Sequence, residues 1–299
     1  MYICKSNAQL YMPVKELPPL RVRDLVYSGR SNHEMLCELI ARATETVRKS
    51  AGLLINTFDA LEARELQRIN DELDTTLVLP IGPLHKLTSK STGSSLLNQD
   101  YSCIEWLDKH PSRSVLYVSF GSLASMNKNE FEEVAWGLAN SGHPFLWVIR
   151  PGLVHGLDDS QIPDEVKVAV EGRGKLIYWA PQQEVLAHHA VGGFWTHNGW
   201  NSTLESISEG IPMICRPKFT DQMMNARYVE EVWGVGFELE GELERGKVEM
   251  AIRKLMLERD GDEMRERAKK LKKKVAECLK VGGSSRTAID KLVHFIHSL

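Results

Sequence analysis

The feature that most constrains the fold is a regular alternation of short apolar runs with amphipathic stretches over the second two thirds of the chain. Runs of strand type lie at residues 115–120, 145–149, 176–179, 193–196, 213–215 and 235–239. Stretches of helical period lie at residues 128–140, 201–209, 222–232, 247–257, 263–279 and 286–297. Asn127 with Glu130 forms a capping box for the first of these helices, and Gly142 follows its end. Strands that alternate with helices predict an α/β fold with a doubly wound parallel sheet.

The first hundred residues show the same kind of alternation but supply too few strands to close a sheet. Residues 32–50 and 61–73 have helical period, and residues 53–57 and 77–81 form short apolar runs. The first 30 residues are expected to be irregular, because three prolines interrupt them. A stretch rich in Ser, Thr and Gly at residues 86–95 is typical of a linker. We therefore expect a domain boundary near residue 100.

Charge, hydropathy and cysteine usage exclude several kinds of partner. Lys and Arg total 37 against 40 Asp and Glu, which leaves a net charge of -3 and argues against a nucleic-acid partner. No stretch reaches the roughly 18 consecutive apolar residues of a membrane span, and the first residues do not resemble a signal peptide. The cysteines are odd in number, widely spread and typical of reduced thiols: Cys4, Cys37, Cys103, Cys215 and Cys278. These features indicate a cytoplasmic chain.

The segment 196–202 has the composition of a phosphate site. It joins a strand to a helix N-terminus, where Gly199 permits a close turn and the first N–H groups of the helix face outward. Such an end attracts an anion through hydrogen bonds and the helix dipole. His197, Asn201 and Ser202 could add donors to the same anion.

The residues around this segment suit the rest of a nucleotide sugar. Glu205 lies three residues beyond Ser202 on the same helix face and could accept hydrogen bonds from a ribose diol. Trp179, at the end of the preceding strand, offers a ring for stacking on a base. Asp221 and Gln222 open the next helix and could bind sugar hydroxyls. Because strand ends meet at one edge of a doubly wound sheet, a nucleotide diphosphate joined to a sugar would satisfy all of them.

Each residue taken singly has an ordinary structural interpretation. Trp179 alone would be a core aromatic, His197 a residue that hydrogen-bonds at a helix start, Glu205 a solvated carboxylate and Asp221 an N-cap. Their combination at these spacings favours the functional interpretation.

Three further motifs favour a structural role. The pair His188-His189 is expected at the surface, with its rings pointing apart, and not as a metal site. Asp260-Gly261-Asp262 has a metal-binding form but is expected in a charged turn between helices. The lysine-rich run at residues 269–274 is expected to be a solvated helix face.

The segment 179–222 closely resembles the signature of the plant family 1 UDP-glycosyltransferases. Residues 102–108, 115–122, 144–151 and 282–285 also look like this family, so the resemblance covers nearly the whole chain. It is strongest toward the group 76 enzymes, and His197-Asn198-Gly199 is similar to the grass benzoxazinoid (DIMBOA) glucosyltransferases. The resemblance implies a GT-B fold and a UDP-glucose-dependent glucosyltransferase that acts on a hydroxyl of a small secondary metabolite. It implies inversion at the sugar, and neither metal nor cofactor.

The resemblance also implies a role for each site residue and each domain. The base and ribose would be bound by Trp179, Ala180, Gln182 and Glu205. The diphosphate would be bound by Ser122, His197, Asn201 and Ser202. The sugar would be bound by Trp200, Asp221 and Gln222, and Gln at the last position is usual for glucose. Residues 1–100 would be a remnant of the acceptor-binding domain with the linker, 101–281 the UDP-sugar-binding domain, and 282–299 a helix that packs back on the first domain.

No catalytic residue is assigned in this chain. Transfer to a hydroxyl needs a general base, and the family places a histidine early in the acceptor domain with an aspartate after it. Neither has a counterpart here, since the helical context of His33 does not match. We therefore expect an N-terminally truncated monomer whose acceptor is a phenolic or benzoxazinoid compound, with an exposed apolar patch on residues 292–299. The alternative is a catalytically inactive fragment that only binds UDP-sugar.

Overall fold

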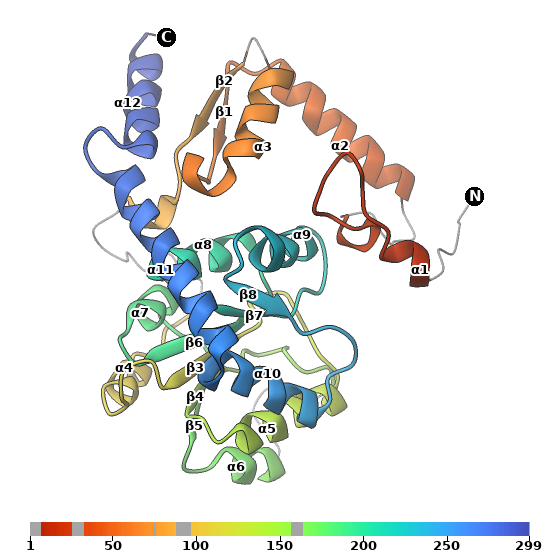
Figure 1. The fold of residues 1–299 in the computed structure, drawn as a ribbon, viewed down its shortest axis with the longest axis vertical. Helices are drawn as coiled ribbons and strands as arrows, with labels where there is room; N and C mark the ends of the chain where they lie inside the picture. Colours follow the sequence, from red (N-terminus) through yellow and green to blue (C-terminus); the bar gives the residue numbers. More distant parts are fainter. Residues whose placement is uncertain (1–6, 26–32, 74–75, 88–96, 157–163, 299) are drawn as a thin grey trace. The chain divides into compact units, whose positions relative to one another are not determined.

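Six parallel strands form the main sheet of the computed structural model, which describes residues 7–25, 33–73, 76–87, 97–156 and 164–298 (Figure 1). The strands in chain order are β3 (Val115–Ser119), β4 (Phe145–Val148), β5 (Gly174–Ile177), β6 (Val191–Thr196), β7 (Met213–Cys215) and β8 (Gly236–Glu238). Their spatial order is β5-β4-β3-β6-β7-β8. The chain thus builds outward from β3 in one direction and then from β6 in the other. This reversal between β3 and β6 confirms the doubly wound sheet and marks the place where ligands bind in such folds.

Helices connect these strands and cover their apolar side chains. They are α4 (Ser102–Leu107), α5 (Lys128–Ser141), α6 (Asp164–Val170), α7 (Gln182–Ala187), α8 (Trp200–Glu209), α9 (Gln222–Arg227), α10 (Arg245–Leu257) and α11 (Arg259–Leu279). All five residues of β3 are buried, as expected of a strand with helices on both faces of its sheet. Trp147 and Trp195 are the largest side chains of this core. The capping box of Asn127 with Glu130 is present at the start of α5, and Gly142 ends the helix at a φ of 76°.

The structure divides into two compact units. The first contains residues 1–26 and 93–269, with the six-stranded sheet, and the second contains residues 27–92 and 270–299. The second unit holds α2 (His33–Arg48), β1 (Gly52–Ile55), α3 (Asp59–Glu72), β2 (Leu77–Pro80), the short 3-10 turn η2 (Leu84–Lys86) and α12 (Ser284–His297). Its two strands are parallel, and Ala288 of α12 packs with Leu79 and Ile81 in a small apolar cluster. Val293 and Ile296, nearer the end of α12, are exposed.

The N-terminal residues contain two short helical turns where the sequence predicts only irregular chain. These are α1 (Asn7–Leu10) and the 3-10 turn η1 (Val22–Asp24). Between them Pro13 and Arg21 form an isolated antiparallel bridge. The segment closes on itself through backbone hydrogen bonds from the N–H groups of Val14 and Val22, so the bridge does not need the N–H that Pro13 lacks.

Several local expectations are wrong for identifiable reasons. Asp260-Gly261-Asp262 lies in the first turn of α11 and not between helices, because Gly261 allows α11 to start close to α10. A Cβ at Gly261 would lie 2.1 Å from the Leu255 carbonyl oxygen. The rings of His188 and His189 do not point apart: their centroids are 4.6 Å from each other, because His188 is the C-cap of α7 and has left the helix.

The predicted helix at residues 222–232 is α-helical only through Arg227 and then continues as one π-helical turn, η3 (Tyr228–Val232). The predicted strand at residues 176–179 lies two positions earlier, at β5, so Trp179 is in the loop that follows it. The short helices α4, α6 and α7 have too few turns to show a period and were not predicted. In the part of the chain that the structure describes, no helix is long and apolar enough to cross a membrane.

Candidate functional site

Most of the predicted site residues lie at the carboxyl-terminal edge of the six-stranded sheet. Strands β3 and β6 are paired so that Ser119 lies opposite Thr196, and Thr196 lies opposite Cys215 of β7. The loops that leave these three strands therefore begin at the same level. They carry Ser122 after β3, His197 after β6, and Asp221 with Gln222 after β7. Trp179 and Ala180 follow β5, and the first turns of α8 carry Trp200, Asn201, Ser202 and Glu205.

A hydrogen-bonded cluster joins α7 to α8. The Gln182 Nε2 group donates to Glu205 Oε2 at 2.6 Å and to Ser202 Oγ at 2.9 Å. Gln183 Nε2 donates to the other carboxylate oxygen of Glu205 at 3.1 Å. Both oxygens of Glu205 thus face amide donors and are held in one orientation. The structure therefore brings Gln182 of α7 to Ser202 and Glu205, which lie one turn apart on α8.

The sequence did not point to Tyr117 or Gln183 as parts of this cluster. Tyr117 lies on the buried strand β3, and its hydroxyl donates to Gln182 Oε1 at 3.1 Å. This bond fixes the amide so that its nitrogen faces Ser202 and Glu205. Burial raises the pKa of Tyr117, so the hydroxyl remains a donor at neutral pH. A tyrosine in a strand that is buried on both faces gives no periodic signal, whereas Gln183 could have been found as the neighbour of Gln182.

His197 lies between two glycines that leave room for its ring. A Cβ at Gly121 would come within 2.4 Å of His197 Cε1 and Nε2, and a Cβ at Gly199 within 2.6 Å of Nε2. Gly121 also has a φ of 71°, a backbone conformation that favours glycine. The ring is therefore tightly enclosed at the meeting point of the β3 and β6 loops.

Asn198, which is buried, stabilises the loop that follows β6. Its backbone is left-handed, with a φ of 61°, a conformation that asparagine tolerates better than most residues. Its Nδ2 group contacts Cys215 Sγ at 3.2 Å, and its carbonyl oxygen accepts from Asn225 Nδ2 at 2.9 Å. The Gly199 N-cap gives no side-chain hydrogen bond to the first turn of α8, and the N-terminus of a helix attracts anions through its dipole.

Arg150 is a further residue that the sequence did not indicate. It follows β4 and reaches the loop after β3, where its Nε donates to the Gly121 carbonyl oxygen at 2.8 Å and its Nη2 donates to that of Ala124. The guanidinium fork thereby holds the loop that carries Ser122, whose side chain is exposed. An arginine at a strand end gives no sequence signal that distinguishes it from a surface arginine.

The loop after β7 is ordered by side chains at its end. Gln222 is 5% exposed, and its Oε1 accepts from the backbone N–H of Lys218 at 2.9 Å and of Phe219 at 3.3 Å. Asp221 accepts from Thr220 Oγ1 at 2.9 Å and from Asn225 Nδ2 at 3.0 Å. Asp221 does not cap α9 with its side chain. Gln222 is therefore a loop anchor, which the sequence interpretation as a sugar-binding residue did not include.

The two aromatic residues of the site are half-buried. Trp179 accepts a hydrogen bond through its carbonyl oxygen from the N–H of Asp100 at 2.8 Å, which fixes the backbone beside the ring. Ala180, next to it, is buried. Trp200 packs at a tilt on Trp233, with ring centroids 6.3 Å apart. Among the described residues no group of three or more His, Cys, Asp or Glu side chains could hold a metal ion.

The buried position of His197 predicts a pH-dependent stability. Burial lowers the pKa of His197 to about 4, against the opposing charge of Asp221, so the ring is neutral at pH 7. The unfolded chain, with an ordinary histidine pKa of about 6.5, binds the proton first as the pH falls. The His197 contribution is therefore complete above pH 6.5 and is lost between about pH 6.5 and 4, by up to about 3 kcal/mol.

Chemical denaturation across this pH range checks this prediction. The unfolding free energy of the parent chain should fall more steeply below pH 6.5 than that of the His197→Gln variant. Above pH 7 the two slopes should agree, which serves as the internal control. Equal slopes over the whole range would show that His197 is not held neutral by the fold.

Known proteins of one family resemble this chain. The model of the family described as UDP-glucoronosyl and UDP-glucosyl transferase matches residues 95–272. UDP-glycosyltransferase 76B1 of Arabidopsis thaliana is 46% identical over 298 residues, which are 99% of this chain and 66% of that protein. The DIMBOA UDP-glucosyltransferase BX9 of Zea mays is 48% identical over 295 residues, which are 96% of this chain and 64% of that protein. The chain spans about two thirds of the length of these relatives.

Solved structures show the same similarity in three dimensions. Os79 from O. sativa in complex with UDP superimposes with a TM-score of 0.78 at 34% identity, over 86% of this chain and 58% of that one. Phytolacca americana UGT2, complexed with UDP-2fluoro-glucose and pterostilbene, gives a TM-score of 0.80 at 31% identity, over 92% and 61% of the two chains. These neighbours confirm the GT-B type of fold. The chain belongs to the plant family 1 UDP-glycosyltransferases, with relatives among the group 76 enzymes.

Proposed function

We propose that the site binds UDP-glucose and serves a glucosyltransferase that acts on a hydroxyl of a small plant metabolite. The observation that carries this proposal is the meeting of three different binding groups at one sheet edge. These are the Gln182–Ser202–Glu205 cluster, the N-terminus of α8 beside neutral His197, and the ordered loop of Asp221 and Gln222. A nucleotide sugar is a ligand that needs a diol acceptor, an anion site and a polyol site in a row.

The diphosphate fits the loop after β6. The N–H groups at the start of α8 would donate to phosphate oxygens, and neutral His197 would donate one more hydrogen bond without adding a charge. Ser202 and Asn201 of the same turn would contribute side-chain donors, and Ser122 would contribute from the β3 loop. This set of donors also stabilises the diphosphate as it leaves, since negative charge grows on it in the transition state.

The ribose and uracil fit the cluster beside it. The Glu205 carboxylate would exchange its amide donors for ribose hydroxyls, and the released Gln182 amide would bind the ribose or the base edge. Trp179 would stack on uracil, with the Ala180 backbone at its edge. In the sugar subsite Asp221 would accept from hydroxyls, the amide group of Gln222 would donate, and Trp200 would line the wall. The relative named as a glucosyltransferase supports glucose as the sugar.

We propose that the reaction inverts the sugar in a single displacement without a metal. An acceptor oxygen forms a bond to the anomeric carbon while the bond from that carbon to the UDP oxygen breaks, and the acceptor proton passes to a general base. We assign none of the described site residues to that base. Donor binding without turnover is therefore the second candidate function. This second candidate is supported by the Gln182–Ser202–Glu205 cluster and the N-terminus of α8, which would bind a donor without a base.

Glucoside formation distinguishes the two candidates. The 299-residue chain is incubated with UDP-glucose and a set of phenolic and benzoxazinoid acceptors, and the products are separated by liquid chromatography with mass detection. Glucoside above the enzyme-free control supports transfer by this chain. UDP binding without glucoside supports the donor-binding function alone.

The stacking role predicts that Trp179→Ala weakens UDP binding about tenfold, because base stacking on an aromatic ring contributes about 1–3 kcal/mol. Isothermal titration calorimetry measures the change. The matched control is Trp136→Ala, which removes another half-buried tryptophan, in the middle of α5, where its ring lies under the guanidinium of Arg245. Unchanged UDP affinity in Trp179→Ala would refute the assignment of the base subsite.

A further inference from the structure

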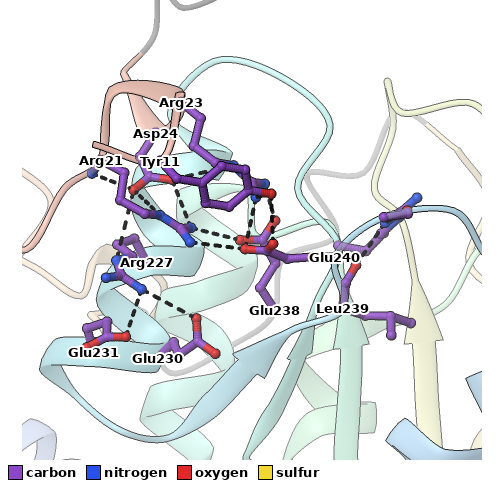
Figure 2. A network of polar contacts seen from close by, with 12 residues as sticks. Tyr11, Arg21, Arg23, Asp24, Arg227, Glu230, Glu231, Glu238, Leu239 and Glu240 are labelled. Carbon is purple, nitrogen blue, oxygen red and sulfur yellow. Dashed lines mark hydrogen bonds and ion pairs between the residues drawn. The ribbon is translucent and has the colours of Figure 1, made fainter. Parts of the chain in front are cut away.

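A charged network ties the N-terminal residues to the far end of the six-stranded sheet. We call residues 9–25 the N-terminal strap. The strap closes on itself through the N–H of Val14 to the Leu20 carbonyl oxygen at 2.8 Å and the N–H of Val22 to that of Met12 at 2.9 Å. It belongs to the same compact unit as the sheet. Figure 2 shows its side chains beside those of β8 and α9.

Asp24 is the buried centre of this network. Its side chain is 1% exposed and accepts three hydrogen bonds from Arg21, one from the backbone N–H at 2.7 Å and two from the guanidinium at 3.1 Å. The Nε atom of Arg227, on α9, lies 4.0 Å from the same carboxylate. Arg21 is therefore the direct partner of the Asp24 carboxylate, and Arg227 adds a second positive charge at longer range. Removing the partner of a buried carboxylate is strongly destabilising, because the charge is then left uncompensated.

The strap also holds the end of β8. Arg23 pairs with Glu238 at 2.7 Å and with Glu240 at 2.9 Å, and Arg21 pairs with Glu240 at 3.1 Å. Tyr11 donates from its hydroxyl to Glu240 at 3.0 Å. Burial lowers the pKa of Arg21, but the hydrogen bonds and charges of Asp24 and Glu240 outweigh it and hold that pKa above its usual value. Salt screens these partly buried pairs less than it screens surface ion pairs. Their formation is opposed by desolvation, since burial raises the pKa of Glu238 against the charge of Arg23.

Arg227 connects the strap to the loop at residues 216–222. We call this the sugar-binding loop, because the proposed function assigns Asp221 and Gln222 to the sugar. Its Nε donates to the Pro19 carbonyl oxygen at 3.1 Å, and its Nη1 donates to Glu231 at 2.7 Å. It is the last residue of α9, and the first residue of that helix is Gln222, preceded by Asp221. A six-residue helix is a rigid link of about 8 Å, so a contact that fixes one end also fixes the other.

A second route leads from the strap to the same loop. Arg216 follows β7 and donates from Nη1 to the Leu239 carbonyl oxygen at 2.8 Å and to that of Gly241 at 2.7 Å. Leu239 lies between the two glutamates that Arg21 and Arg23 hold. The loop that runs from Arg216 to Asp221 is thus supported at its start through β8 and at its end through α9.

We propose that the N-terminal strap positions the sugar-binding loop. In this proposal Arg227 is bound by the strap and α9 connects it rigidly to Asp221 and Gln222. The proposal rests on the proposed function for the identity of the ligand. Among the described residues no hydrogen bond or ion pair joins the strap to Asp221 or Gln222, so Arg227 and Asp24 are positioning residues. Their loss should weaken contacts to the sugar more than contacts to the nucleotide, which is bound by α7, α8 and the β6 loop.

The test compares the half-buried Arg227 with the buried Arg265. Arg227→Met removes the link to the strap. Arg265→Met is the matched control. Arg265 is 7% exposed and donates to the carbonyl oxygens of Gly192 and Leu255, which are not part of this loop. Titration calorimetry of the full 299-residue chain gives the dissociation constants for UDP and UDP-glucose. Hydrogen exchange of peptides that cover residues 216–225, without ligand, reports on the loop itself.

We expect Arg227→Met to raise the dissociation constant of UDP-glucose about tenfold while that of UDP changes less than about threefold. Exchange at residues 216–225 should become faster in this variant, whereas Arg265→Met should change neither the ratio of the two constants nor that exchange. An equal loss for UDP and UDP-glucose, or unchanged exchange in the loop, would overturn the proposal.

Two further arms separate this proposal from the proposed function. If the parent chain binds neither UDP nor UDP-glucose, the proposed function fails, and the exchange of residues 216–225 alone decides for or against the strap. If Arg227→Met does not fold, Asp24→Asn and Arg227→Lys take its place. Arg227→Lys, which keeps the charge near Asp24, should show a smaller loss than Asp24→Asn, and the reverse order would contradict the role of Arg227.

Discussion

Replacing Gly121 by alanine should lower UDP affinity at least about 100-fold and destabilise the fold by about 2–4 kcal/mol. The new Cβ would lie 2.4 Å from two ring atoms of His197, and the φ of 71° is unfavourable for alanine. His197 would have to leave its position, because Gly199 encloses the other side of the ring. Calorimetric titration with UDP and chemical denaturation measure the two effects.

Gly142→Ala is the matched control for this substitution. Gly142 has a φ of 76°, but no atom lies within 4 Å of the Cβ that alanine would add. Gly142→Ala therefore has the unfavourable backbone conformation of Gly121→Ala but no steric clash with another side chain. We expect it to lower stability by about 1 kcal/mol and to leave UDP affinity unchanged. Similar UDP affinities in Gly121→Ala and Gly142→Ala would contradict the enclosed position of His197.

Replacing Glu205 by alanine should lower UDP affinity about 100-fold. The carboxylate is the acceptor proposed for the ribose hydroxyls, and two hydrogen bonds to a charged group contribute about 1.5 kcal/mol or more each. The substitution also leaves the amides of Gln182 and Gln183 without this acceptor. UDP titration checks the result.

The control for this substitution is Glu209→Ala. Glu209 lies one turn further along α8, toward the end of the helix away from the phosphate loop. We expect its replacement to leave UDP affinity within about twofold, since charge at that distance is screened. Equal losses in Glu205→Ala and Glu209→Ala would indicate a general effect on α8 and not a ribose contact.

Most of the fold could be predicted because its causes are local. The buried run at β3, the capping box at Asn127 and the glycine at position 142 each act within a few residues, so the sequence displays them directly. The two-residue error at β5 has the same origin, since Leu176 and Ile177 are apolar and the aromatic residues Tyr178 and Trp179 extend that run into the loop. The doubly wound order then follows from the alternation.

The position of the proposed donor-site residues could be predicted for a different reason. The strands of a doubly wound sheet end at one edge, so the topology alone predicts that the residues after β6 and β7 lie close together. The supports of these residues could not be predicted. Tyr117 and Arg150 act across strands, and a single sequence does not reveal which side chain of a buried strand meets Gln182.

The strap is the clearest limit of sequence reasoning in this chain. Arg21 and Glu238 are 217 positions apart, and nothing in the composition around either residue indicates the other. The segment at residues 9–25 is short and rich in proline. This composition correctly predicts little regular structure, but it does not indicate a buried ion pair. Long-range charge pairs depend on the completed fold and become visible only with it.

The central claim is that this chain carries an assembled UDP site at the carboxyl-terminal edge of its six-stranded sheet. Calorimetric titration of the folded 299-residue chain with UDP, beside the Glu205→Ala variant, tests it most directly. We predict saturable binding of one UDP per chain that is reduced about 100-fold in the variant. No saturable binding to the folded parent chain, or equal affinity in the two proteins, would contradict it.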